Sequence, residues 1–191
     1  MTRTFIAVEL PNNVRAFLTQ EITRLGQALP GVRWVDPESL HLTLAFLGEL
    51  DGEALAAAKT ATQEAATAGA PFTLRTDAIG TFGPRQAPRV IWIGVQGETA
   101  RLLATQETLT QRLEKAGFPR EQRQYSPHLT LARLKAPLAA EALTKLVQRQ
   151  RESVQASASW RANELSVMKS EFLRGSAHYT RLQAYPLVSS S

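Results

Sequence analysis

The sequence predicts an α+β protein built on largely antiparallel sheets. Helical and strand-like segments are mixed along its 191 residues, without the strict alternation of a βαβ dinucleotide-binding fold. No Gly-x-Gly-x-x-Gly or Walker-type glycine loop occurs, so the chain has neither of the common phosphate-binding loops. No Ser/Gly-rich linker separates two domains, and we expect a single domain over residues 1–191.

Apolar patterning and turn residues place the elements of the first half. Residues 5–10 are apolar and partly β-branched, and they predict a strand. Apolar residues at helical spacing follow, with Asn12 or Asn13 as the expected cap, and this helix breaks at Pro30. Residues 53–68 are rich in Ala, Glu and Lys and predict a second helix. Strands are also expected at 32–35 and 40–47, with a turn at 36–39 between them.

The second half repeats this mixture. A strand is expected at 89–95, and because residues 90–95 are apolar throughout, it is expected to be central and buried on both faces. Residues 99–115 carry leucines along one side and predict a helix, and residues 138–149 predict another. Further strands are expected at 72–78, 128–134, 157–160, 164–170 and 179–184, and irregular segments at 80–88 and 120–127.

Composition limits the possible chemistry. The chain has 22 Lys and Arg against 17 Asp and Glu, a net charge of +5 that suits an anionic partner such as a nucleotide or RNA. The absence of cysteine excludes disulfides, thiolate nucleophiles and cysteine-ligated metal sites. The first apolar stretch is too short for a secretory signal, and no run of about 18 apolar residues could span a bilayer. We therefore expect a soluble, cytoplasmic protein with no membrane partner.

One pentapeptide occurs twice. His-Leu-Thr-Leu-Ala begins at His41 and again at His128, 87 residues later, and these repeats use two of the three histidines in the chain. Each copy lies in a strand-like run, where residues two apart point to the same face. His41 and Thr43 therefore share one face and His128 and Thr130 another, while the leucines face a core. Two related halves that face one another would bring two imidazoles and two hydroxyls together.

This set of groups suits phosphoryl chemistry. One imidazole can activate the attacking hydroxyl or water while the other protonates the leaving oxygen. The threonine hydroxyls can donate hydrogen bonds to the non-bridging phosphate oxygens. Such a site requires no metal or other cofactor. A zinc site would need His178 or carboxylates in addition to both repeats, and no Gly-x-Ser-x-Gly elbow supports a serine hydrolase.

These motifs resemble those of the two-histidine (2H) phosphoesterase superfamily, and most closely the RNA 2′,3′-cyclic phosphodiesterases, formerly called 2′–5′ RNA ligases. The resemblance covers nearly the whole chain and is carried by five blocks: Phe5–Pro11, His41–Gly48, Val90–Gly94, Pro127–Arg133 and Ser170–Tyr179. It implies a bilobal fold in which two pseudosymmetric, mostly antiparallel sheets line a central cleft, with helices outside. It also implies that the enzyme opens an RNA 2′,3′-cyclic phosphate to a 2′-phosphate. In that reaction His128 would be the base and His41 the acid, and the roles would swap in 2′–5′ ligation.

Two further residues belong to the family pattern. Arg133 follows the second motif and is a candidate to bind a phosphate oxygen, the alternative being a solvated surface arginine. Phe46 follows the first motif and is a candidate to stack on the terminal base, the alternative being a core aromatic. Strict alternation places both on the face opposite their histidine. They reach a shared site only if the strand ends or bulges first.

Two other functions fit the same residues. The enzyme could act instead on a small cyclic nucleotide or ADP-ribose cyclic phosphate, which comparison of a mononucleotide with an oligomer would test. A non-catalytic RNA-binding module would bind RNA in a salt-sensitive way without forming product. No motif indicates a protein partner, and a monomer is expected.

Overall fold

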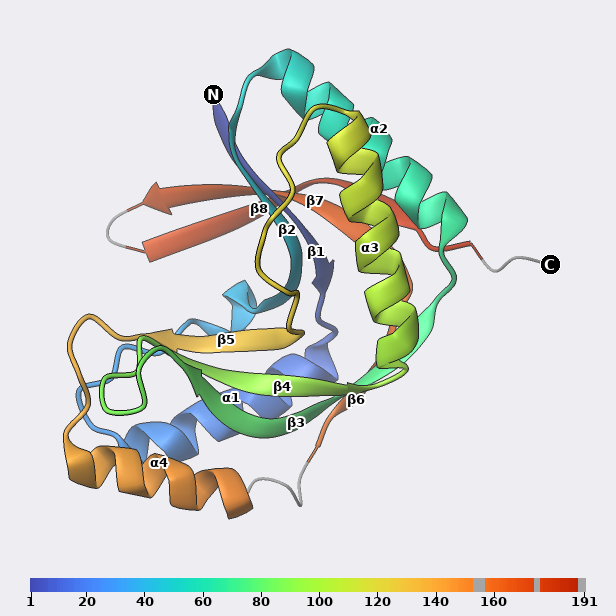
Figure 1. Ribbon diagram of the computed structural model, residues 1–191. Helices are drawn as coiled ribbons and strands as arrows, with labels where there is room; N and C mark the ends of the chain where they lie inside the picture. Colours follow the sequence, from blue (N-terminus) through green and yellow to red (C-terminus); the bar gives the residue numbers. More distant parts are fainter. Residues whose placement is uncertain (153–156, 174–175, 189–191) are drawn as a thin grey trace.

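The computed structural model describes residues 1–152, 157–173 and 176–188. In this part of the chain, two four-stranded antiparallel sheets and four α-helices form the mixed α+β fold that the sequence predicted. Figure 1 shows the two sheets one above the other, with helices on the outside. Within the described residues, no helix is both long enough and apolar enough to cross a membrane.

The first sheet, here called sheet A, has the strand order β2-β1-β7-β8. Its strands are β1 (Thr2–Glu9), β2 (His41–Leu50), β7 (Glu164–Leu173) and β8 (Ser176–Pro186). The first motif lies on β2, at one edge of the sheet. Sheet A therefore joins the N-terminal part of the chain to its C-terminal hairpin.

The second sheet, sheet B, has the order β5-β4-β3-β6. Its strands are β3 (Phe72–Phe82), β4 (Val90–Gly97), β5 (His128–Arg133) and β6 (Ser159–Ala162). The second motif occupies β5, again an edge strand, so the two sheets place their motifs at corresponding positions. This correspondence is the pseudosymmetry that the repeated pentapeptide predicted.

Four helices cover the sheets. They are α1 (Asn12–Ala28), α2 (Gly52–Ala68), α3 (Thr99–Lys115) and α4 (Ala140–Glu152). Helix α2 begins where the Asp51 carboxylate accepts a hydrogen bond from the Ala54 N–H, at 2.8 Å, and it packs on β7 and β8. Helices α2 and α3 lie together, and α1 packs against α4 (Figure 1).

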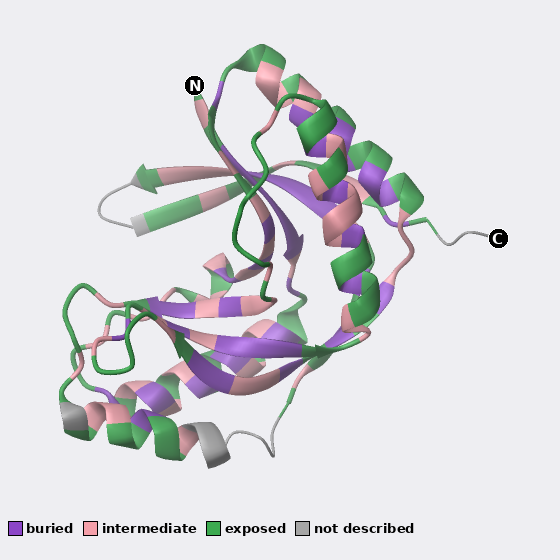
Figure 2. Ribbon diagram, in the orientation of Figure 1, coloured by how far each residue is buried: buried purple, intermediate pink, exposed green. Residues whose placement is uncertain are grey.

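The core is apolar and continuous. Buried side chains from both sheets and from the helices form one main cluster, and the purple positions in Figure 2 lie mainly on the strands and on the helix sides that face them. The motif leucines belong to this cluster: Leu42, Leu44, Leu129 and Leu131 are almost fully buried. Burial of each leucine stabilises the fold by about 1.5–3 kcal/mol and fixes the orientation of its strand. The single domain expected over residues 1–191 stays a prediction.

Some segments differ from the sequence-based expectation. The strand expected at 32–35 is only a single bridge between Trp34 and Ala132, because the chain turns directly afterwards into a short 3₁₀ helix, Pro37–Ser39. Neither asparagine caps α1 with its side chain. The capping position is Pro11, and the Asn13 amide instead donates to the Ser159 carbonyl at 3.0 Å.

Strands β3 and β4 also differ. Strand β3 continues to Phe82 because its last three residues pair with Val90, Ile91 and Trp92. A Cβ on Gly80 would clash with ring carbons of Trp92, so only glycine allows this ring to lie on the strand. Strand β4 is central, as expected, but only one face is fully buried, because Val90 and Trp92 are half-buried on the other.

Candidate active site

The two motif strands lie at neighbouring edges of the sheets. Strand β2 of sheet A contacts β5 of sheet B (Figure 1). The hydroxyl of Tyr125, three residues before His128, donates a hydrogen bond to the backbone carbonyl of Thr43 at 2.9 Å. Burial raises the pKa of this phenol, so the hydroxyl keeps its proton and remains a donor. One side chain thus ties the segment before the second motif to the middle of the first.

The register of β1 shows which side chains share a face with His41. Cross-strand neighbours in an antiparallel pair point the same way, as do residues two apart on one strand. Each motif residue on β2 has a partner on β1: His41 pairs with Glu9, Thr43 with Ala7, and Phe46 with Phe5. The three partners alternate along β1. His41, Thr43 and Phe46 therefore lie on one face of sheet A, which we call its histidine face.

A β-bulge brings Phe46 to this face. Two adjacent residues of β1 are paired with Thr43 and Ala45, so Leu44 is an extra residue on β2. One extra residue reverses the alternation of side chains. Phe46 is 70% exposed, so it is not the core aromatic that the alternative interpretation required.

Strand β5 contains the same bulge at the same place in its motif. Ile91 and Trp92 are adjacent on β4, but their partners on β5 are Ala132 and Thr130, which leaves Leu131 as the extra residue. Gly94 and Val90, the partners of His128 and Arg133, lie on the same face of β4 as Trp92. His128, Thr130 and Arg133 therefore share the histidine face of sheet B.

At each bulge, the backbone carbonyl of the extra residue accepts a hydrogen bond from a donor outside its own sheet. The Leu131 carbonyl accepts a hydrogen bond from the Val35 N–H at 2.8 Å. The Leu44 carbonyl accepts one from the Gln106 amide at 3.4 Å. Because buried carbonyls must be paired, these two contacts help to keep both bulges in place.

The two imidazoles are held in the same way. Nδ1 of His41 lies 2.9 Å from the Ser39 carbonyl, and Nδ1 of His128 lies 2.7 Å from the Ser126 carbonyl. A carbonyl only accepts, so Nδ1 is the donor in both rings and carries a proton. In the neutral form, Nε2 is therefore left unprotonated and able to take a proton.

Aromatic rings pack against both imidazoles. The His41 ring lies 4.5 Å from the ring of Phe5 and 4.9 Å from that of Tyr179, centroid to centroid. The His128 ring lies 4.8 Å from that of Phe82 and 6.3 Å from that of Trp92. These contacts restrict the rotation of each imidazole ring and so help to keep its hydrogen bond in place.

Burial is the main cause that lowers the pKa of His41 and His128 below 6.5. The Nδ1 hydrogen bond opposes the shift in each case, and the positive charge of Arg133 adds to it in both. Glu9 opposes the lowering at His41, and among the described residues no corresponding carboxylate acts on His128. Arg133 therefore lies within electrostatic reach of both imidazoles, while the site is asymmetric in its acidic neighbour.

A pocket of about 130 Å³ lies beside His41. It is lined by Glu9, Arg15, Glu38, Ser39, Leu40, His41, Met168, Tyr179 and Arg181. Glu9 accepts a hydrogen bond from the Ser166 hydroxyl at 2.6 Å and lies 3.5 Å from Arg181. Its carboxylate is thus held in place next to the imidazole.

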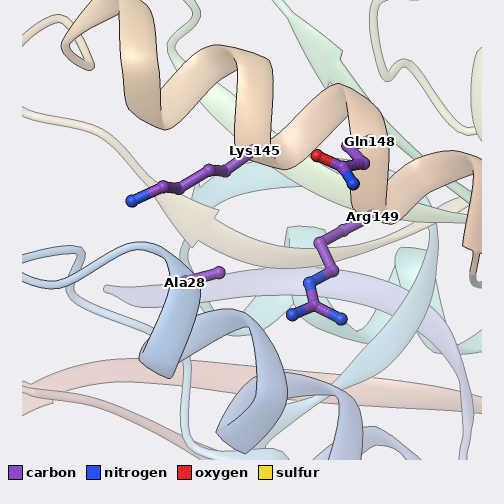
Figure 3. A pocket seen from close by; sticks show the side chains of 4 residues that line it. All are labelled: Ala28, Lys145, Gln148 and Arg149. Carbon is purple, nitrogen blue, oxygen red and sulfur yellow. The ribbon is translucent and has the colours of Figure 1, made fainter.

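A second pocket, of about 210 Å³, lies between the end of α1 and α4. Figure 3 shows the four residues that line it, Ala28, Lys145, Gln148 and Arg149. It contains none of the residues that the motifs predicted. Among the described residues, no group of three or more His, Asp and Glu side chains is arranged to hold a metal ion.

The structure thus places all six predicted site residues on the histidine faces of two adjoining strands, and their functional roles stay predictions. In the described part of the chain, neither the Thr43 nor the Thr130 hydroxyl has a hydrogen-bond partner, so both are available to a ligand. Sequence reasoning missed Glu9 and the aromatic neighbours of the imidazoles. The one available signal for Glu9 was a lone carboxylate in an otherwise apolar strand.

Comparison with known proteins agrees with the motif resemblance. A family model described as the 2′-5′ RNA ligase superfamily matches residues 11–171. An RNA 2′,3′-cyclic phosphodiesterase of Methanothermobacter thermautotrophicus is 31% identical over 186 residues, which are 97% of this chain and 98% of that relative. One of Geobacillus stearothermophilus is 36% identical over 145 residues, 74% of this chain. The match spans 46%, about half, of that relative's length.

Solved structures show the same fold. The crystal structure of TT0787 of Thermus thermophilus matches with a TM-score of 0.78 and 30% identity, covering 97% of each chain. E. coli LigT complexed with 3′-AMP matches with a TM-score of 0.75 and 26% identity, covering 98% of this chain and 99% of LigT. Since the family model covers most of the sequence and one relative aligns from end to end, the chain belongs to the 2′-5′ RNA ligase superfamily.

Proposed function

We propose that this chain is an RNA 2′,3′-cyclic phosphodiesterase that opens a terminal cyclic phosphate to a 2′-phosphate by acid/base catalysis with His41 and His128. The observation that supports this most strongly is that the same kind of hydrogen bond orients both imidazoles. Each lies at the start of an edge strand and donates from Nδ1 to the carbonyl two residues earlier. Relatives aligned over much of the chain carry the name of this activity.

The reaction needs one base and one acid. The Nε2 lone pair of a neutral imidazole takes a proton from water, and the water oxygen forms a bond to phosphorus. The bond from phosphorus to O3′ breaks, and the second imidazole, protonated on Nε2, gives its proton to O3′. The product has a 2′-phosphate and a free 3′-hydroxyl, and the same groups run the reverse ligation with their roles exchanged.

We assign His128 as the base and His41 as the acid. Burial lowers the pKa of His41, and Glu9, its cross-strand partner, opposes part of that lowering, whereas His128 has Gly94 in the equivalent position. A carboxylate beside an imidazole favours the protonated form, which an acid must supply. A bound phosphate anion also favours the protonated form of a nearby imidazole, which helps the acid to hold its proton until it is transferred.

The remaining polar groups bind the phosphate. The hydroxyls of Thr43 and Thr130 lie two residues after the histidines on the same faces and are positioned to donate to the non-bridging oxygens. The Arg133 guanidinium, which acts electrostatically on both imidazoles, holds the negative charge that the phosphate carries. Phe46, exposed on the histidine face of sheet A, offers a stacking surface to the terminal base.

The test uses a short oligoribonucleotide with a 2′,3′-cyclic phosphate end, incubated with the protein in EDTA. We expect a 2′-phosphate end as the product. His41→Ala and His128→Ala should each lower kcat by about 10²- to 10⁴-fold, the usual contribution of a general acid or base. His178→Ala is the matched control, because His178 is exposed on β8, pairs with Glu171 and belongs to neither motif. A 3′-phosphate product, or full activity in either motif variant, would contradict the proposal.

A further inference from the structure

The seven phenylalanines of the chain differ sharply in exposure, and two are left largely in solvent. Phe46 on β2 is 70% exposed and Phe172 on β7 is 76% exposed. The other five are buried or half-buried. Phe46 belongs to the proposed site, but Phe172 lies in the C-terminal hairpin and has no part in the proposed chemistry.

Phe172 lies on the histidine face of sheet A. Tyr179 pairs with Ser170, and its ring contacts the rings of His41 and Phe5, so Ser170 also points to this face. Phe172 is two residues further along β7 and points the same way. Lys169 and Glu171, which form an ion pair at 2.7 Å, occupy the opposite face of the strand.

The two exposed rings are separated along the sheet. Phe46 and Met168 both pair with Phe5, so they lie at the same height along the strands of sheet A. Phe172 lies four residues beyond Met168 on β7. At the rise of a β-strand this is about 13 Å along β7, with β1 between the two strands. If the terminal base stacks on Phe46, a base on Phe172 must belong to a nucleotide further upstream.

Charged groups accompany the rings. Arg3 is exposed on the same face of β1, two residues before Phe5, with Glu49 as its cross-strand partner. Within the described residues Arg3 forms no ion pair, so its charge is available to a phosphate. Arg133 stands on the histidine face of sheet B. Exposed aromatic rings along a surface that also carries cations are typical of single-stranded nucleic-acid binding.

We propose that the histidine face of sheet A continues from Phe46 to Phe172 as a stacking surface for upstream nucleotides. The preferred substrate is then a single-stranded RNA end of several nucleotides and not a mononucleotide. This inference rests on the proposed function and specifies its substrate. Phe172 binds RNA in this account and touches no reacting atom.

The experiment compares adenosine 2′,3′-cyclic phosphate with a trinucleotide that ends in the same group. Phe172→Ala should lower kcat/KM for the trinucleotide about fivefold or more, the lower end of base–aromatic stacking, and leave the mononucleotide unchanged. Phe172→Trp keeps an aromatic face and should retain the preference for the trinucleotide. Leu103→Ala removes an exposed apolar side chain on α3, and as control should change neither value.

Two results would overturn the inference: equal losses on both substrates, which indicate a structural role, or no loss on either. If the unmodified protein turns over neither substrate, the proposed function fails, and binding decides this inference separately. The fluorescence anisotropy of a labelled trinucleotide with a 2′-phosphate end then measures affinity directly. Weaker binding by Phe172→Ala supports the stacking surface, and unchanged binding rejects it.

Discussion

Arg133 is the residue whose replacement most sharply separates the proposed site from a chance arrangement of two histidines. Its charge lowers the pKa of both imidazoles, which lie on different sheets. Arg133→Met should therefore raise both values together. In a bell-shaped profile of kcat/KM against pH, the acidic limb reports the base and the basic limb the acid of the free enzyme. Both limbs should move to higher pH.

The same substitution should weaken phosphate binding. A hydrogen bond to a charged group contributes about 1.5–3 kcal/mol, so kcat/KM at the optimum should fall by about 10- to 150-fold. Arg133→Lys keeps the charge but loses the planar guanidinium. Both limbs of the pH profile should therefore stay close to their original positions, while kcat/KM at the optimum should still fall. Lys135→Met is the control for loss of one exposed charge, since Lys135 affects neither imidazole. Movement of one limb alone, or of either limb to lower pH, would show that Arg133 does not act on both imidazoles.

Three further predictions concern stability and the support of the site. Tyr125→Phe removes the hydrogen bond to the Thr43 carbonyl and should lower the free energy of unfolding by about 1 kcal/mol, as measured with urea. It should also lower kcat. A loss of stability with unchanged kcat would show that this hydrogen bond does not position the motifs. Gly80→Ala forces a Cβ against the Trp92 ring and should cost about 1–3 kcal/mol, lowering Tm by about 2–4 °C for each kcal/mol; an unchanged Tm would contradict the packing described. Because the pKa of both motif imidazoles is lower in the folded chain, the unfolded chain binds more protons below pH 6.5, so Tm should fall as pH decreases through that range. Replacing both motif histidines with glutamine should reduce this fall, and an identical pH dependence would argue against the shifts.

Much of the site could be predicted from the sequence because alternation on a strand is a local property. The His-x-Thr pairs and the buried leucines follow from a period of two residues, and the repeat showed that the two halves correspond. The family resemblance then supplied Phe46 and Arg133. Their place on the histidine faces was not predictable from alternation alone, because each bulge depends on partners distant in the sequence.

The bulges illustrate this limit. The carbonyl of the extra residue Leu131 accepts a hydrogen bond from Val35, and that of the extra residue Leu44 accepts one from Gln106. Neither donor is marked by any pattern in the chain. The strand expected at 32–35 was wrong for a related reason: only Trp34 of that segment bridges to β5 before the chain turns.

The neighbours of the His41 imidazole could not be predicted from the sequence either. Glu9 lies 32 residues before His41 and reaches it only because β1 and β2 pair in this register. Tyr179 reaches the same imidazole from the C-terminal hairpin. Such contacts arise from sheet topology, so a sequence indicates the chemical groups of a site more readily than their surroundings.

The most direct test of the central claim is a crystal structure of the protein with adenosine 2′-phosphate, the product of the proposed reaction on the mononucleotide. We expect Nε2 of His128 to lie about 2.6–3.2 Å from a phosphate oxygen and Nε2 of His41 to lie at a similar distance from O3′ of the same molecule. A nucleotide that contacts only one imidazole, or binds away from both, would contradict catalysis by the pair.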